Sequence, residues 1–187
     1  MTGQSSGGGR RPGAALPRWP VRIADVPAGG VHVRRRDVPP DDLAAFAAWI
    51  GVDAMSALDL DIHVRPYRGD GLAVEGKVTA TVTQTCVVTL EPVENVIAEE
   101  VEVTFRPEDK LKAHLVHDEE DGLSIDASVA ADDPLLGNGI DAAAIAAEFL
   151  ALGVDPYPRK PDAAFEPPED GAEISPFAGL SKLKRGT

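Results

Sequence analysis

The chain has 187 residues, of which 43% are hydrophobic and only 5% aromatic, with a formal net charge of −13 and one cysteine. This length allows one domain of ordinary size, whose core needs no metal or disulfide to hold it together. A single cysteine excludes a disulfide framework and any zinc or iron–sulfur site built from several cysteines, and no apolar run approaches the ~18 residues that a transmembrane helix requires.

The charge is distributed unevenly along the chain. Residues 1–36 hold seven arginines and one acidic residue, whereas residues 37–187 hold eleven basic and thirty acidic residues, a net charge of −19. An acidic body repels a phosphate backbone and favours basic partners, while a basic N-terminal region can still contact nucleic acid. Residues 1–18 are rich in Gly, Ser, Pro and Arg and predict a disordered tail.

The first ordered elements are predicted to follow Trp19. Hydrophobic alternation indicates short strands at 21–23 and 31–33. A helix is expected next, capped by Asp41 or Asp42 and ended by Gly51. Its apolar face consists of Leu43, Phe46, Ala47 and Ile50.

The clearest strand patterns lie at 58–64 and 72–83, joined by a turn at 66–71, which predicts an antiparallel pair. A further strand is expected over 96–106. Each strand has one apolar and one polar side, so one face of the sheet should be solvated. The predicted fold class is therefore α+β: a mostly antiparallel twisted sheet or partly open barrel with two or three short helices.

The C-terminal part is predicted to begin with a charged loop over 107–122 and a short strand at 123–125. A helix capped by Asp141 and ended by Gly153 follows. The Pro-rich segment 154–174 should run irregularly over the surface. Residues 19–187 then form a single domain. The apolar face of the helix ended by Gly153 is formed by Ile145, Phe149 and Leu152, and that of a short terminal helix opened by Ser175 and Pro176 is formed by Phe177, Leu180 and Leu183.

Few residues suggest catalysis or metal binding. His114 and His117, spaced i, i+3 and followed by four acidic residues, could hold a metal on a helix or belong to a solvated loop. Cys86 could be a nucleophile or a structural residue at a strand end. Its nearest ionisable neighbour along the chain, Glu91, would raise the pKa of the thiol if it lay close. A structural role is favoured for Cys86, and a solvated loop is favoured for His114 and His117.

The basic residues have two readings as well. Arg34, Arg35 and Arg36 could contact RNA or an acidic protein, or could be solvated beside a turn. The same holds for the C-terminal cations Lys182, Lys184 and Arg185.

Three segments together resemble one known family, the YceD proteins, also called DUF177 or large ribosomal RNA subunit accumulation proteins. The first is Gln84–Val93, whose Cys-Val-Val-Thr-Leu-Glu-Pro form resembles the alphaproteobacterial branch. The second is Ile140–Asp141 with the helix after it, continuing into Asp155–Lys160. The third is Ser175–Lys184. The resemblance runs from about Trp19 to the C-terminus.

The resemblance implies a bacterial, cytoplasmic, non-catalytic factor that promotes accumulation of 23S ribosomal RNA and assembly of the large subunit. Candidate partner or RNA contacts are Arg34, Arg35, Arg36, Arg159, Lys160, Lys182, Lys184 and Arg185. Family-motif residues with structural roles are Cys86, Pro92, Pro156, Pro176, Phe177, Leu180 and Leu183.

One departure from the family pattern is important. Many members have Cys-x-x-Cys where this chain has Cys86 and Thr89, so any zinc site of such relatives cannot be carried over, because one thiolate is not a tetrahedral site. We therefore expect no metal and no cofactor, and apolar packing around Cys86 in place of a ligand.

The partner stays open at this point. The 23S rRNA precursor could bind the basic residues, or a basic large-subunit ribosomal protein could bind the acidic body. The alternatives are an acidic interaction module of another complex and a cysteine- or metal-dependent enzyme. No membrane association is expected, and the oligomeric state is not predicted.

Overall fold

The computed structural model describes residues 15–111 and 132–164. Its helices and strands, in chain order, are β1 (Pro20–Arg22), the 3-10 helix η1 (Ile23–Asp25), β2 (Val31–Arg35), α1 (Pro40–Ile50), β3 (Ala54–Tyr67), β4 (Gly71–Thr85), β5 (Pro92–Pro107), β6 (Asp133–Leu135), β7 (Gly139–Asp141) and α3 (Ala142–Leu152).

The strands form one open five-stranded sheet and a small separate pair. The sheet has the order β2-β3-β4-β5-β6, and β1 pairs with β7 alone. All neighbours are antiparallel except β5 and β6, which run parallel. The predicted α+β class with a mostly antiparallel sheet is confirmed, and the sheet is not closed into a barrel.

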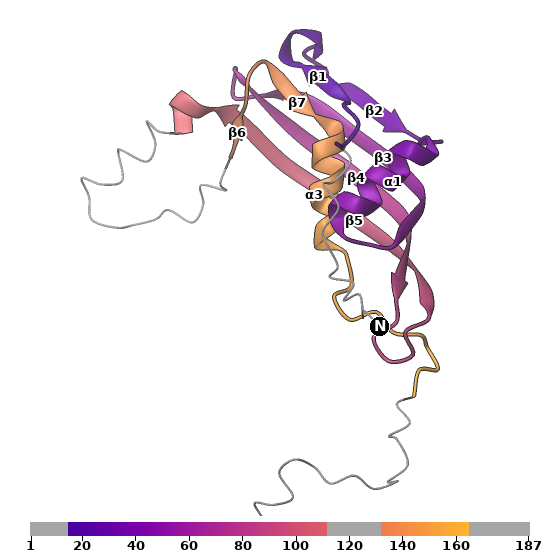
Figure 1. Cartoon of the computed structure of the whole chain (residues 1–187). Helices are drawn as coiled ribbons and strands as arrows, with labels where there is room; N and C mark the ends of the chain where they lie inside the picture. Colours follow the sequence, from indigo (N-terminus) through magenta and orange to yellow (C-terminus); the bar gives the residue numbers. More distant parts are fainter. Residues whose placement is uncertain (1–14, 112–131, 165–187) are drawn as a thin grey trace, which may run out of the picture.

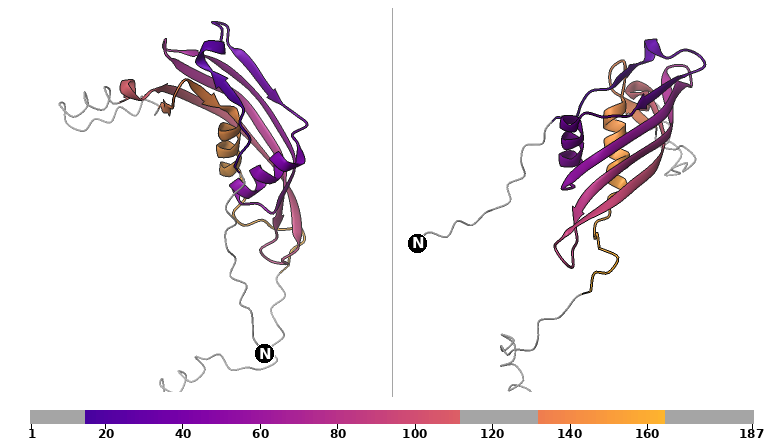
Figure 2. Two further views of the ribbon diagram at one scale, coloured as in Figure 1. Left: turned by 45° about the horizontal axis from the view of Figure 1, so that its top comes forward. Right: turned by 90° about the vertical axis from the view of Figure 1, so that its right-hand side faces the viewer.

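The two faces of the sheet differ as the alternation predicts. On β3, Leu60, Ile62 and Val64 have no exposed surface, whereas Asp59 and Asp61, which alternate with them, lie on the opposite face. Figures 1 and 2 show α1 and α3 packed against the same face of the sheet. The other face is solvated.

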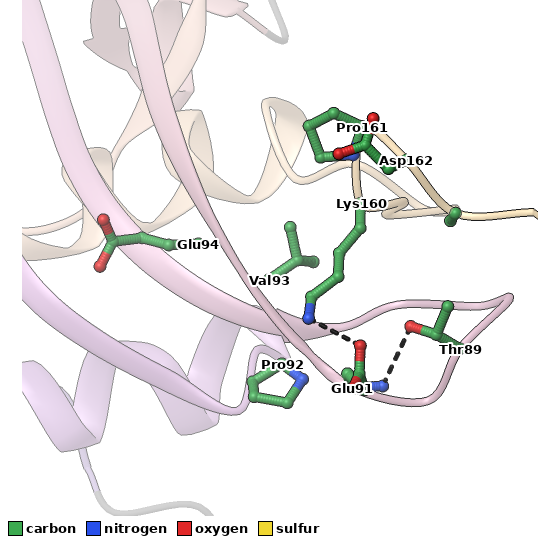
Figure 3. A pocket seen from close by; sticks show the side chains of 9 residues that line it. Thr89, Glu91, Pro92, Val93, Glu94, Lys160, Pro161 and Asp162 are labelled. Carbon is green, nitrogen blue, oxygen red and sulfur yellow. Dashed lines mark hydrogen bonds and ion pairs between the residues drawn. The ribbon is translucent and has the colours of Figure 1, made fainter.

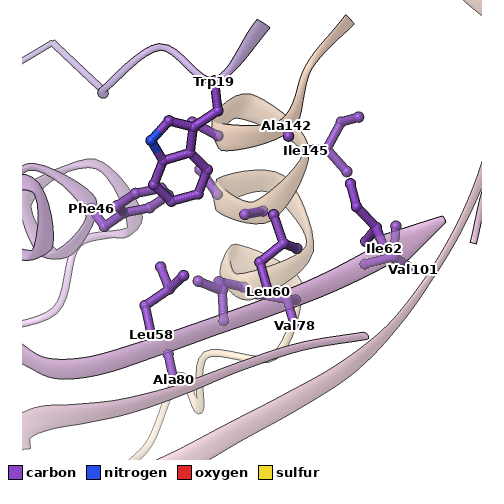
Figure 4. Close-up of a cluster of buried hydrophobic side chains, with 14 of the residues drawn as sticks. Trp19, Phe46, Leu58, Leu60, Ile62, Val78, Ala80, Val101, Ala142 and Ile145 are labelled. Carbon is purple, nitrogen blue, oxygen red and sulfur yellow. The ribbon is translucent and has the colours of Figure 1, made fainter. Parts of the chain in front are cut away.

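The core lies between the two helices and the sheet. Trp19 packs against Phe46 of α1, with ring centroids 5.4 Å apart, and both face the leucines of β3 (Figure 4). Small side chains let α3 approach the sheet closely. Fully or almost fully buried alanines of α3 are Ala142, Ala143, Ala146 and Ala147.

The helix ends follow capping rules. The Asp141 Oδ1 atom accepts hydrogen bonds from Ala143 N at 3.0 Å and from Trp19 N at 2.9 Å, so one carboxylate caps α3 and fixes the chain before β1. At the end of α1, Gly51 has φ 81° and its N–H bonds to Ala47 O, the left-handed cap that glycine favours.

The predicted N-cap of the first helix is wrong. Asp41 and Asp42 lie in the first turn of α1, and Pro39 is the N-cap residue. Pro40 begins the helix, where N–H groups lack intrahelical partners and proline is well tolerated. On the predicted apolar face of α3, Ile145 is buried, whereas Leu152, the last residue of the helix, is 79% exposed.

Several predictions lie outside the described residues. These are most of the N-terminal tail, most of the charged loop with His114 and His117, the strand at 123–125, and the terminal helix with Pro176, Phe177, Leu180 and Leu183.

Candidate functional site

Arg34 of β2 and Arg36, just after it, form ion pairs with aspartates of the neighbouring strand. Arg34 lies opposite Asp61 in the strand register, and its Nε is 2.9 Å from Asp61 Oδ2. Arg36 makes the same contact with Asp59, also at 2.9 Å. All four side chains are partly exposed, so each ion pair adds little to the stability of the fold. Its main effect is to place opposite charges side by side. Arg34 and Arg36 therefore form ion pairs and not an open basic patch.

Arg35 points to the other face of β2. Its guanidinium carbon lies 5.7 Å from the centroid of the Trp19 ring, a cation–π distance. Arg35 thus covers the exposed edge of the core at Trp19. The three consecutive arginines that the sequence grouped together are split between two faces of the sheet.

The opposite side of the sheet is acidic. β3 and β4 separate β2 from β5, and the acidic residues of β5 are Glu94, Glu99, Glu100 and Glu102. β5 therefore carries more negative charge than the β2 edge, where Arg34 and Arg36 are paired with aspartates.

The end of the β4–β5 hairpin binds a segment from far along the chain. We call residues 155–163, which follow α3, the docked segment. Gln84 Nε2 donates to Asp155 O at 2.8 Å, and Asn95 Nδ2 holds Gln84 Oε1 at 2.9 Å. Val87 N donates to the oxygen of the buried Pro158 at 2.9 Å. Figure 1 shows the hairpin extending past both helices, with the docked segment beside its tip.

Lys160 completes this attachment. Its Nζ lies 2.7 Å from Glu91 Oε2, and Figure 3 shows the side chain reaching across a shallow pocket to that carboxylate. The hydrogen bond and charge of Lys160 lower the pKa of Glu91. Lys160 is therefore an internal partner in the structure, whereas its neighbour Arg159 is exposed.

Cys86 lies at the centre of the hairpin end and has no exposed surface. Its sulfur accepts hydrogen bonds from Thr89 N and from Lys160 N, both at 3.5 Å. The Thr89 hydroxyl and these N–H groups lower the pKa of the thiol to about 6, although burial acts to raise it.

One expectation about Cys86 is corrected by these contacts. The sulfur is not surrounded by apolar packing alone, because it accepts hydrogen bonds from Thr89 N of the hairpin turn and from Lys160 N of the docked segment. The pKa of the thiol is lowered, and the carboxylate of Glu91 is bound by Lys160. Among the described residues, no three histidine, cysteine or carboxylate side chains gather as a metal site.

Among the candidate partner contacts, Lys160 lies beside Cys86 and Glu91 at the hairpin end. Arg34, Arg35 and Arg36 lie elsewhere, at the β2 edge of the sheet. Pro92 begins β5, and Pro156 lies in the docked segment. Lys182, Lys184 and Arg185 lie outside the described residues. The docking of residues 155–163 on the hairpin was not predicted. The sequence signal for it is that both contacting segments, 84–93 and 155–160, belong to the family resemblance.

Comparison with known proteins identifies one family. The model of the family described as "Large ribosomal RNA subunit accumulation protein YceD" matches residues 74–184, more than half of the chain. A search of curated proteins and a search of solved structures both found no match. No helix in the described ranges has the length and apolar character that crossing a membrane requires. The matched range contains the hairpin end, Cys86 and the docked segment, and the chain belongs to the YceD family, whose name implies a role in accumulation of the large ribosomal RNA.

Proposed function

We propose that this protein promotes large-subunit assembly, and with it 23S rRNA accumulation, without catalysis, by binding a basic protein of the large subunit. It holds that protein in a soluble state until rRNA replaces the acidic surface. The choice of a basic protein over the rRNA precursor as the direct partner rests on charge. The observation that carries it is the pairing of Arg34 with Asp61 and of Arg36 with Asp59, which places a carboxylate beside each of these candidate phosphate contacts and so weakens their attraction for phosphate.

The remaining charge supports the same partner. Residues 37–187 carry thirty acidic and eleven basic residues. Glu94, Glu100 and Glu102 of β5 are exposed, and a surface of one sign attracts partners of the opposite sign and speeds their association. An rRNA backbone would instead be repelled by this surface, because each phosphate carries a negative charge.

A non-catalytic role agrees with the environment of Cys86. A nucleophilic cysteine must be reached by its substrate, and this sulfur is fully buried. Its hydrogen bonds come from backbone groups that hold the docked segment to the hairpin. The thiol therefore serves as a structural acceptor.

The test is a pair of binding measurements on the full chain. One uses a transcribed 23S rRNA precursor over a series of salt concentrations, and the other uses RNA-free total protein from large subunits. Total protein from small subunits is the control for nonspecific attraction to basic proteins. We expect saturable binding to one or a few large-subunit proteins and weak binding to the rRNA.

Tight rRNA binding with a steep salt dependence would contradict the proposal. Each phosphate contact contributes a log–log slope of about −0.9 on duplex and about −0.7 on single strands. A slope equal to several contacts, with no capture of large-subunit protein, would return the RNA route to first place.

A further inference from the structure

Three exposed apolar side chains belong to the end of the β4–β5 hairpin and to the segment docked on it. Leu90 is 77% exposed, Val87 45% and Tyr157 70%. Val87 and Leu90 belong to the hairpin turn, and Tyr157 belongs to the docked segment beside it. We call these three residues the apolar tip. Because buried apolar surface is the main favourable term in association, exposed apolar groups grouped in this way mark a contact surface.

The apolar tip is held in one conformation. Cys86 N donates to Glu91 O at 2.8 Å, Leu90 N donates to Cys86 O at 2.9 Å, and Val87 N donates to Pro158 O at 2.9 Å. Tyr157 N is fixed by Asp155 Oδ1 at 2.8 Å. A contact surface that is ordered before binding loses less conformational entropy when the partner binds.

The backbone of Leu90 is the strongest sign that the tip has a role beyond folding. Leu90 has φ 59°, in the left-handed region where residues other than Gly, Asn and Asp are disfavoured. Its side chain gains little burial in return, because it is mostly exposed. Gly or Asn would suit the fold better at this position. Unfavourable conformations of this kind are characteristic of functional sites.

The charges next to the tip are mainly acidic. Glu91, Glu94 and Asp162 line the pocket beside the hairpin (Figure 3), and Asp155 precedes Tyr157. Lys160 neutralises Glu91, and Arg159 is an exposed cation two residues after Tyr157. An apolar centre with an acidic rim is complementary to a protein with an apolar recess between Lys and Arg side chains.

We propose that the apolar tip is the docking surface for the basic large-subunit protein, with Leu90 entering an apolar recess and the acidic rim facing Lys and Arg residues. This inference rests on the proposed function and assigns it a surface. Residues at the centre of such an interface carry most of its affinity, and Leu90, as the most exposed of the three, is the expected anchor.

The test compares Leu90→Asn with Leu136→Asn in the full chain. Asn tolerates a positive φ, so Leu90→Asn removes the anchor without disturbing the turn. Leu136, 75% exposed between β6 and β7, is a matched control away from the hairpin end. The probe is the RNA-free total protein of large subunits, with the captured proteins identified by mass spectrometry. Urea unfolding and sedimentation are measured for each variant.

We expect Leu90→Asn to weaken capture of the identified basic protein at least about tenfold. Its midpoint of unfolding should be equal to or above that of the wild type, and Leu136→Asn should bind normally. Equal capture by all three proteins would overturn the tip as the surface and leave the proposed function standing. No capture by the wild type would overturn the proposed function itself.

Three further outcomes would each assign the apolar tip a partner other than the basic large-subunit protein. A lower unfolding midpoint for Leu90→Asn would mean that another part of this chain covers the tip. A change in sedimentation limited to this variant would mean that a second copy does so. Binding of the wild type to rRNA, lost in Leu90→Asn, would make the tip an RNA contact.

Discussion

Cys86 and Lys160 are 74 positions apart in the chain, yet the backbone N–H of Lys160 donates to the Cys86 sulfur at 3.5 Å. Thr89 N donates to the same sulfur from within the hairpin turn. One buried sulfur thus joins the hairpin to the docked segment.

The reactivity of Cys86 should be limited by access and not by its protonation state. With a pKa of about 6, the thiol is largely ionised at neutral pH, but it has no exposed surface. Iodoacetamide at neutral pH should therefore label the native protein very slowly and label the protein in denaturant quickly, with a small thiol as the rate control. Fast labelling of the native protein would support a nucleophilic role for Cys86.

Stability should rise with pH through the titration of Cys86. The folded thiol has a pKa of about 6, against 9.0 for the unperturbed group, so the unfolded state binds more protons between these values. The contribution to the free energy of unfolding is fully present above pH 9.0 and is lost as the pH falls through about 6. Urea unfolding of the wild type and of Cys86→Ser over this range measures it. If the difference between the two proteins did not change with pH, the lowered pKa would be wrong.

Asp141→Ala should destabilise the fold through two lost hydrogen bonds. The carboxylate caps α3 and also holds Trp19 N, and loss of an N-cap alone lowers the free energy of unfolding by about 1–2 kcal/mol. Asp141→Asn is the matched control, because its amide oxygen can still accept both bonds. Chemical denaturation measures both variants, and an equal loss in the two would assign the effect to the charge of Asp141 and not to capping.

Gly76→Ala should be strongly destabilising, although it adds one methyl group to the middle of β4. Gly76 has φ 155°, and a Cβ atom there would lie 2.2 Å from Asp61 O and 2.7 Å from Ile62 Cα of β3. Gly29→Ala is the control, since nothing lies within 4 Å of the added atom. We expect a loss of at least about 1–3 kcal/mol for Gly76→Ala in thermal or urea unfolding and almost none for the control. Equal stability of the two variants would contradict this contact.

Local periodicity was enough to predict most of the sheet and the helices α1 and α3. The alternation of apolar and polar residues in β3 and β4 predicts which side chains are buried, because successive side chains of a strand point to opposite faces. The sequence did not predict β6 or β7. Each has only three residues, too few for a period to show, and each depends on a partner strand that is distant in sequence.

The candidate site could be predicted only in part, because its contacts are long-range. Arg34, Arg35 and Arg36 are consecutive in sequence, but adjacent residues of a strand face opposite sides, and the partners of Arg34 and Arg36 lie on β3. Likewise, nothing local in 154–174 indicates that Pro158 and Lys160 bind the hairpin. The left-handed conformation of Leu90 was not predicted, because the sequence there lacks the glycine that usually signals it.

Recovery of ribosomal material from lysate tests the central claim most directly. The tagged full chain is captured with and without RNase treatment, and both the proteins and the RNA are identified. The claim predicts that a basic large-subunit protein is recovered in both conditions, with 23S precursor present only without RNase. Loss of every large-subunit protein after RNase would show that rRNA is the direct partner, and absence of ribosomal material from both samples would contradict a role in large-subunit assembly.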